Sequence, residues 1–156
     1  MIAYYEVTEG LYNHLKADVD INTVKIGGNI TDVNFNKQEI YPFGHLLISS
    51  CEFINGVVRF SLTVSVIDIV DKTKKDIRDE NEKFKGIDNE QDVLNTMLAV
   101  LENLNRELKK GTFEDDGWEL IGSTVAERVQ EQFQDLAIGW QTTFTVDVPN
   151  NVQNCG

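Results

Sequence analysis

The stretch CEFINGVVRFSLTVSVIDIVD, residues 51–71, decides the fold that we expect for this chain. Its Asn55-Gly56 pair is a strong signal for a β-hairpin, because these residue types readily adopt the positive φ angles of a two-residue turn. We therefore expect a strand over residues 45–54, the turn, and a return strand over residues 57–71. Such a return strand is far longer than the usual five or six residues, which suggests a hairpin that reaches beyond its own core.

The return strand alternates between apolar and polar residues over most of its length. Its apolar positions are Val58, Phe60, Leu62, Val64 and Val66, and its polar positions are Arg59, Ser61, Thr63 and Ser65. One dry face and one wet face predict an antiparallel sheet with helices on a single side. The pattern slips at Asp68, which falls on the apolar face. We therefore expect either a bulge there or a strand that has already left the core.

Two amphipathic helices are expected, at residues 2–17 and 89–110. The apolar stripe of the first consists of Tyr4, Val7, Leu11 and Leu15, and the seam of the second of Val93, Met97, Leu101, Leu104 and Leu108. Asp88 suits the N-cap of the second helix and Gly111 its C-terminal cap. The seam covers fewer than three heptads, which favours packing in a core over a coiled coil.

The remaining segments are shorter or less regular. We expect strands at residues 23–26, 118–123 and 137–148, an ordered loop at residues 29–42, and either a polar strand or a short helix at residues 126–135. Pro149 ends the last strand, and residues 149–156 are interpreted as a C-terminal tail. The order of elements predicts a single domain over residues 1–156 with an α+β fold. Its antiparallel or mixed sheet has two main helices packed on one face and a long hairpin arm.

The charge of the chain is strongly acidic, and its bases are unevenly placed. There are 26 acids and 14 bases, and the net charge of −12 argues against nucleic-acid binding by the domain as a whole. Residues 72–86, which we call the arm, hold six bases and four acids. The arm therefore carries +2 and leaves −14 for the rest. This segment is either a solvated loop or a basic arm that docks on an acidic surface of a neighbouring copy.

The sequence shows no recognisable catalytic or cofactor-binding motif. There is no P-loop and no nucleophile elbow, and the two histidines, His14 and His45, are too few and too separated for a zinc site. Asp18, Asp20 and Asn22 resemble the start of a calcium loop, but the positions that need glycine and glutamate hold threonine and asparagine. We therefore expect no catalytic, cofactor-binding or metal-binding residues, and no enzyme.

The cysteines and the apolar segments bear on the cellular compartment in which the chain is made. Two cysteines are too few for a disulfide framework, so we expect Cys51 to be a buried free thiol and Cys155 a free thiol near the chain end. No signal-peptide pattern opens the chain, and no apolar run approaches the roughly 20 residues of a membrane span. These features predict synthesis in a reducing cytoplasm.

Four segments carry a resemblance to a family of structural proteins. They are NFNKQEIYP at residues 34–42, VIDIVD at 66–71, DNEQDVLNT at 88–96 and GWQTTFTVDVPN at 139–150. In the order and residue pattern of these segments, the chain resembles phage head–tail connector and tail-completion (tail-terminator-like) proteins, most closely the ring proteins of crAss-like phages.

The resemblance implies a helix-on-sheet subunit that closes into a ring between portal and tail. Twelve copies would match a portal, and six are usual for tail terminators. It also implies a virion protein, made in the host bacterial cytoplasm, whose partners are copies of itself and neighbouring portal or tail ring proteins. DNA would pass through the lumen without specific binding, no membrane would be involved, and the family has no catalytic residues to carry over.

The expected subunit interface combines the bases of the arm with the start of the tail. Its residues are Lys72, Lys74, Lys75, Arg78, Lys83, Lys85, Pro149 and Asn150. Head-to-tail ring closure needs one surface that complements a different surface on the next copy, and a basic arm on an acidic body offers such a pair. Two other functions stay open. An acidic DNA mimic or inhibitor would bind a basic partner, and an enzyme would need an acid pair that only the fold reveals.

Overall fold

The computed structural model describes residues 3–28, 40–70, 90–129 and 137–150. The elements in chain order are α1 (Ala3–Ala17), β1 (Thr23–Ile26), β2 (Phe43–Ile54), β3 (Val57–Ile69), α2 (Glu90–Lys110), α3 (Thr112–Asp115), β4 (Glu119–Val129) and β5 (Ala137–Pro149). The five strands form one sheet in the order β1-β2-β3-β5-β4. The predicted N-cap Asp88 and most of the expected loop at residues 29–42 lie outside the described residues.

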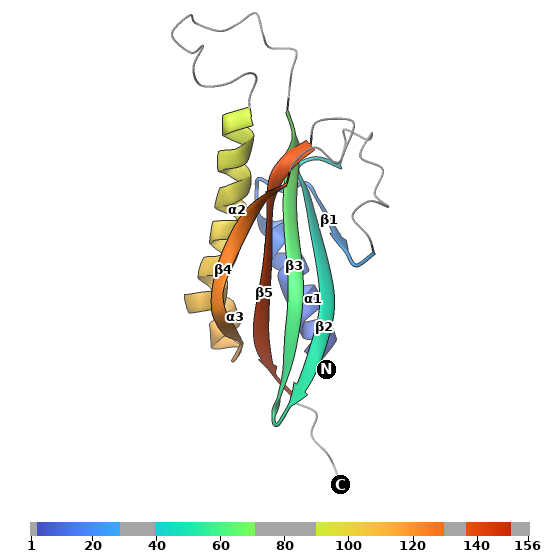
Figure 1. The fold of residues 1–156 in the computed structure, drawn as a ribbon, viewed down its shortest axis with the longest axis vertical. Coiled ribbons are helices and arrows are strands. Elements are labelled where there is room, and N and C mark those ends of the chain that lie inside the picture. The colour runs from blue at the N-terminus through green and yellow to red at the C-terminus, as the bar shows by residue number, and fades with distance from the viewer. Residues whose placement is uncertain (1–2, 29–39, 71–89, 130–136, 151–156) are drawn as a thin grey trace, which may run out of the picture.

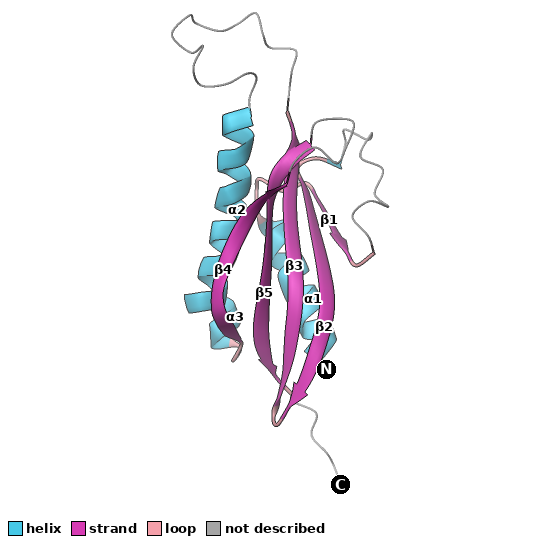
Figure 2. Ribbon diagram, viewed as in Figure 1, coloured by secondary structure: helices cyan, strands magenta, loops and turns pink. Residues whose placement is uncertain are grey.

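The predicted fold class is confirmed. β1 pairs with β2 in parallel and every other neighbouring pair is antiparallel, so the sheet is mixed. The two main helices, α1 and α2, pack on the same face of the sheet (Figure 1, Figure 2). We call this the inner face, and the opposite one the outer face.

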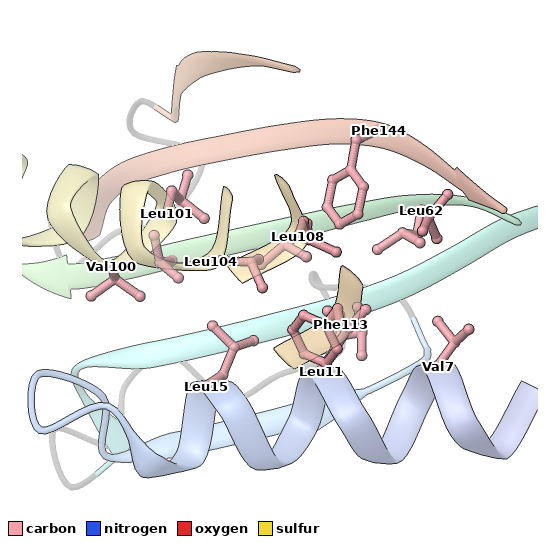
Figure 3. Packing of buried hydrophobic residues seen from close by; sticks show 14 of the residues in the cluster. Val7, Leu11, Leu15, Leu62, Val100, Leu101, Leu104, Leu108, Phe113 and Phe144 are labelled. Atoms are coloured by element: carbon pink, nitrogen blue, oxygen red, sulfur yellow. The ribbon is translucent and has the colours of Figure 1, made fainter. Parts of the chain in front are cut away.

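The hydrophobic core fills the space between the helices and the inner face (Figure 3). In α1, Val7, Leu11 and Leu15 have no exposed surface, which confirms the predicted stripe. Tyr4 is the exception, because it is 47% exposed. Ala3 is buried in its place, four residues before Val7, so the stripe repeats at every fourth residue. The predicted seam of α2 is buried along its whole length.

The β2–β3 hairpin differs between its two ends. We define its closed end as residues 43–46 with 64–69, away from the Asn55-Gly56 turn, because both faces of the sheet are covered there. Its open end is residues 47–54 with 57–63, next to the turn. At the closed end both faces of the sheet are buried, because Phe43, Ile67 and Ala137 form a second cluster with Tyr41 on the outer face. At the open end, only the inner face of β3 is buried.

This burial explains the slip at Asp68, and the predicted bulge or departure from the core is wrong. β3 pairs with β5 in one unbroken register from Val57 to Ile69, and the register shifts lie in β2 and β4 instead. The polar–apolar alternation ends because residues on both faces become buried, as the fully buried Val66 and Ile67 show. Asp68 stays on the inner face, where its Oδ1 accepts a hydrogen bond from the Ile69 amide at 2.7 Å.

β4 joins two segments that the sequence pattern separates. Residues 118–123 and 126–135 were expected as distinct elements, whereas one strand covers Glu119–Val129. The short-helix alternative is therefore wrong for residues 126–129, and residues 130–135 lie outside the described part of the chain. The strand carries a register shift between Ile121 and Val125, and Gly122 there has a φ of 73°. Such a bulge breaks the two-residue period by which a strand is recognised.

The end of α2 also differs from the prediction. Gly111 is not a left-handed C-cap, since its φ is −139°, and it serves as the N-cap position of α3. A side chain there would overlap α2, because an added Cβ lies 2.7 Å from the Cα of Glu107. The carboxylate of Glu107 accepts a hydrogen bond from the Thr112 amide at 2.9 Å, and this bond lowers the pKa of Glu107. The glycine is therefore required for close packing between two consecutive helices.

Candidate functional site

The predicted interface residues fall into two groups. The six bases of the arm lie outside the described residues, so their role stays a prediction. Pro149 is the last residue of β5 and pairs with Val57, and the Asn150 amide donates a hydrogen bond to the Gly56 carbonyl at 3.0 Å. Pro149 and Asn150 are therefore held beside the hairpin turn and do not belong to a separate tail.

One free edge of the sheet runs along the open end of β2. β1 pairs only with residues 43–46, and no described strand pairs with residues 47–54 on that side. Phe53 is 82% exposed on this edge. Cys51 is exposed too, so the predicted buried thiol is wrong, because the helices leave this part of the edge strand uncovered. The segment contains no lysine or proline, although it carries one charged residue, Glu52, and a register shift between Ile48 and Ser50.

The opposite edge of the sheet belongs to β4, and it is protected. The bulge at Gly122 interrupts the strand, and Glu127 and Arg128 place charges along it. Arg128 forms an ion pair with Glu90 at the start of α2. Bulges and charges are two of the means by which natural sheets prevent edge-to-edge pairing. The two edges differ in that the β4 edge is joined to α2 by the Arg128–Glu90 ion pair, whereas the open end of β2 presents the exposed Phe53, and they lie on opposite sides of the molecule (Figure 1).

A cleft of about 270 Å³ lies between α2 and β4. Its apolar lining consists of Leu98, Leu101, Leu104, Leu108, Ala126 and Phe144, and Figure 3 shows four of these residues within the core. Its polar lining consists of Glu102, Asn105, Thr124 and Thr142. The Thr124 hydroxyl donates a hydrogen bond to Oδ1 of Asn105 at 2.8 Å, which ties the bulged part of β4 to α2.

Thr142 is the unusual polar residue of this cleft. It is 7% exposed, and its hydroxyl has no hydrogen-bond partner among the described residues. Its neighbour on the same face, Trp140, is satisfied, because its Nε1 donates to the Leu94 carbonyl at 2.8 Å. Buried hydroxyl groups are normally hydrogen-bonded, and leaving one unsatisfied costs about 1–3 kcal/mol.

The outer face of the open end carries a ladder of polar pairs between β3 and β5. Arg59 donates two hydrogen bonds to the carboxylate of Asp147, at 2.7 and 3.0 Å, and this pairing raises the pKa of Arg59. The Thr63 and Thr143 hydroxyls lie 3.1 Å apart in the next part of the ladder. Because these groups satisfy one another, the ladder contributes structure and leaves no free nucleophile–base pair.

The two histidines lie in different parts of the fold and contact different residues. Burial lowers the pKa of both His14 and His45. Nε2 of His45 lies 3.0 Å from the Gly27 carbonyl oxygen, whereas the His14 ring packs edge-on against Phe113. In the described part of the chain, no group of three or more His, Cys, Asp or Glu side chains is placed to hold a metal ion. No described helix is long and apolar enough to cross a membrane.

The candidate site therefore consists of two dissimilar edges and a cleft, which are binding features. The sequence analysis missed the cleft, although one signal was present: Thr142 interrupts the apolar row of β5 between Trp140 and Phe144. It also missed the free edge of β2, because that edge depends on which strand pairs with which and for how many residues.

Neither protein-family models nor curated proteins give a match to this chain.

Proposed function

We propose that this chain is a structural virion protein whose copies close into a ring in the head–tail connector or tail of a phage. The ring would join portal to tail and surround the DNA channel. Twelve copies are favoured, to match a portal, and six are the alternative. Neighbouring portal or tail ring proteins are the expected partners.

The observation that carries this proposal is the pair of dissimilar edges on one sheet. A closed ring is built head to tail, so each copy needs two different surfaces on opposite sides. The edge of β2 with the exposed Phe53 and the edge of β4 with the Arg128–Glu90 ion pair are two such surfaces. A symmetric dimer, in contrast, needs one self-complementary surface.

The charge supports a channel role. A net charge of −12 repels phosphates, so DNA would move through an acidic lumen without adhering. The arm carries the opposite sign from the rest of the chain, and we propose that it docks on the acidic surface of an adjacent subunit.

Cryo-electron microscopy of the intact particle that contains this chain tests the proposal. We expect a closed ring of this subunit at the junction of portal and tail, with the β2 edge and the arm packed against other chains. A particle that lacks the chain, together with capture of a basic nucleic-acid-binding protein by it, would favour the acidic-mimic function instead.

Charge reversal in the arm tests its part in assembly. Replacing Lys74, Lys75 and Arg78 with Glu should reduce incorporation into the ring at least about tenfold, with an unchanged thermal melt of the subunit. The matched comparison uses two double variants. Lys74→Glu/Lys75→Glu changes the charge of the arm, and Lys109→Glu/Lys110→Glu makes the same change in charge at exposed positions of α2. Equal assembly of the two double variants would remove the arm from the interface.

A further inference from the structure

We propose that the outer face of the sheet, at the open end of the hairpin, binds the arm of a second copy of this chain. The inference rests on the proposed ring function and deepens it, because it names the surface that receives the arm. The contact would pair lysine and arginine side chains of the arm with glutamates on the sheet.

The outer face of the open end is a sheet surface that neither main helix covers. α1 and α2 pack on the inner face, and the cluster around Tyr41 and Phe43 covers the outer face at the closed end. Ser50 in β2, Val125 in β4 and Thr143 in β5 are all exposed on the outer face of the open end. Three strands therefore present one continuous surface together with β3, and we call it the receiving face.

One row of charged side chains crosses the receiving face through four strands. Glu52 of β2 pairs with Arg59 of β3. Asp147 of β5 pairs with Arg59 on one side and with Glu119 of β4 on the other. Because directly paired residues point to the same face of a sheet, three acids and one base stand side by side. We call these four residues the acidic row.

The two ends of the acidic row hold carboxylates that the subunit itself does not neutralise. Arg59 is engaged by Asp147 through two hydrogen bonds. Glu52 and Glu119 are exposed, and neither forms an ion pair with another described residue. The row therefore offers two carboxylates, on either side of a neutral pair, to bases from outside the subunit.

The arm carries the complementary charge. Residues 72–78 hold four bases and one acid, a net charge of +3. The segments that build the receiving face hold one base and three acids, a net charge of −2; they are residues 47–54, 57–63, 119–125 and 143–149. Opposite charges of this kind orient two surfaces and exclude wrong pairings.

The acidic row is out of reach of the first lysines of the same subunit's arm. Arg59 and Ile69 lie in one strand of unbroken register, and ten residues of a strand span about 33 Å. β3 thus runs from the hairpin turn to the opposite end of the sheet (Figure 1). Lys75 follows Ile69 by six residues, which reach at most about 21 Å when fully extended. The two charged surfaces can therefore meet only between copies, as a head-to-tail assembly requires.

Exchange of charge between the two surfaces tests the contact. Each variant is supplied as the sole copy of the chain during particle assembly, and quantitative mass spectrometry measures the amount of the chain in purified particles. Glu52→Lys/Glu119→Lys and Lys74→Glu/Lys75→Glu should each lower this amount at least about tenfold, because like charges then face each other. The variant with all four substitutions restores opposite charges and should return to within about threefold of the wild type.

Two further variants serve as controls. Glu9→Lys/Glu102→Lys makes the same change in charge at exposed positions of α1 and α2 and should leave the amount of incorporated chain unchanged. Glu52→Gln/Glu119→Gln removes the two charges without placing lysines beside Arg59, and should lower incorporation about three- to tenfold. Thermal melts show which variants are folded, and the Gln variant carries the test if the Lys variant is not.

Two outcomes would overturn the proposal and leave the ring proposal intact. One is full incorporation of a folded variant that lacks the charges of Glu52 and Glu119. The other is a variant with all four substitutions that assembles no better than the two double variants. Wild-type particles that contain no ring of this chain would overturn both proposals, so the wild type tells the two failures apart.

Discussion

The closed and open ends of the β2–β3 hairpin are made from the same two strands, yet they serve different purposes. At the closed end, both faces of the sheet are buried and β1 covers the edge of β2. At the open end, β2 is exposed along its edge and the outer face is polar. The difference teaches that one end is part of the buried core, while the other leaves its edge and outer face uncovered. The following predictions test that division, from the largest expected effect to the smallest.

Truncating an apolar side chain should cost much more stability at the closed end than at the open end. Ile67→Ala at the closed end removes a fully buried side chain and should lower the free energy of unfolding by about 2–5 kcal/mol. Phe53→Ala at the open end removes a side chain that is 82% exposed and should change it by about 0.5 kcal/mol or less. Denaturant unfolding measures both. Similar losses for the two variants would show that the open end is part of the core.

Gly139 tests how tightly the closed end is packed. An added Cβ at Gly139 would lie 1.8 Å from the Val66 carbonyl oxygen and 2.8 Å from the Cα of Ile67, so β5 must shift to admit it. We expect Gly139→Ala to cost about 1–3 kcal/mol or more, as overpacking does. Gly44→Ala is the matched control, because its Cβ meets its nearest neighbour, Val24, at an ordinary 3.7 Å. A control variant as unstable as Gly139→Ala would mean that the close contact with Val66 is not the cause of the lost stability.

Substitution of Asp68, at the closed end, should have a smaller effect on the free energy of unfolding, and this effect should depend on pH. Burial raises the pKa of its carboxyl, so the folded state favours the protonated form. Stability linked to this group is therefore lost as pH rises from the unfolded-state value, about 3.9, through the higher folded-state pKa. Asp68→Asn should be more stable than the wild type at pH 7, and the gain should disappear below about pH 3.5. Thermal melts across this range measure it, and a gain that persists at pH 3 would point to a cause other than ionisation.

Substitution of Cys51 should give the smallest change in the free energy of unfolding. The accessibility of its thiol to a labelling reagent should change most clearly on assembly. Because its side chain is exposed on the open end, Cys51→Ser should alter the free energy of unfolding by about 0.5 kcal/mol or less. In a Cys155→Ser background, a thiol reagent should label Cys51 of the folded subunit as fast as a free thiol. In the assembled ring, labelling should slow at least about tenfold. Equal labelling before and after assembly would exclude the β2 edge from the subunit contact.

The sequence by itself determined the elements and the fold class. The Asn55-Gly56 turn, the two-residue alternation of β3 and β5, and the stripes of α1 and α2 reflect local geometry, so periodicity alone locates them. Periodicity failed where the burial of a residue depends on partners that are distant in the sequence. Asp68 was misread because both faces of the sheet become buried there, and the outer-face cluster that buries one of them comes from several separate segments. Cys51 was misread because its strand lies at an edge, and β4 because a bulge removes its period.

The binding features were decided only by the tertiary structure. The free edge exists because β1 stops pairing at Leu46, and the cleft exists because β4, β5 and α2 meet around Thr142. A sequence specifies which side chains are apolar at each step of a strand, but not which strand lies beside it or what remains uncovered. That information appears when the chain forms its long-range contacts, and in this protein it separates a buried core from an uncovered sheet edge and a cleft.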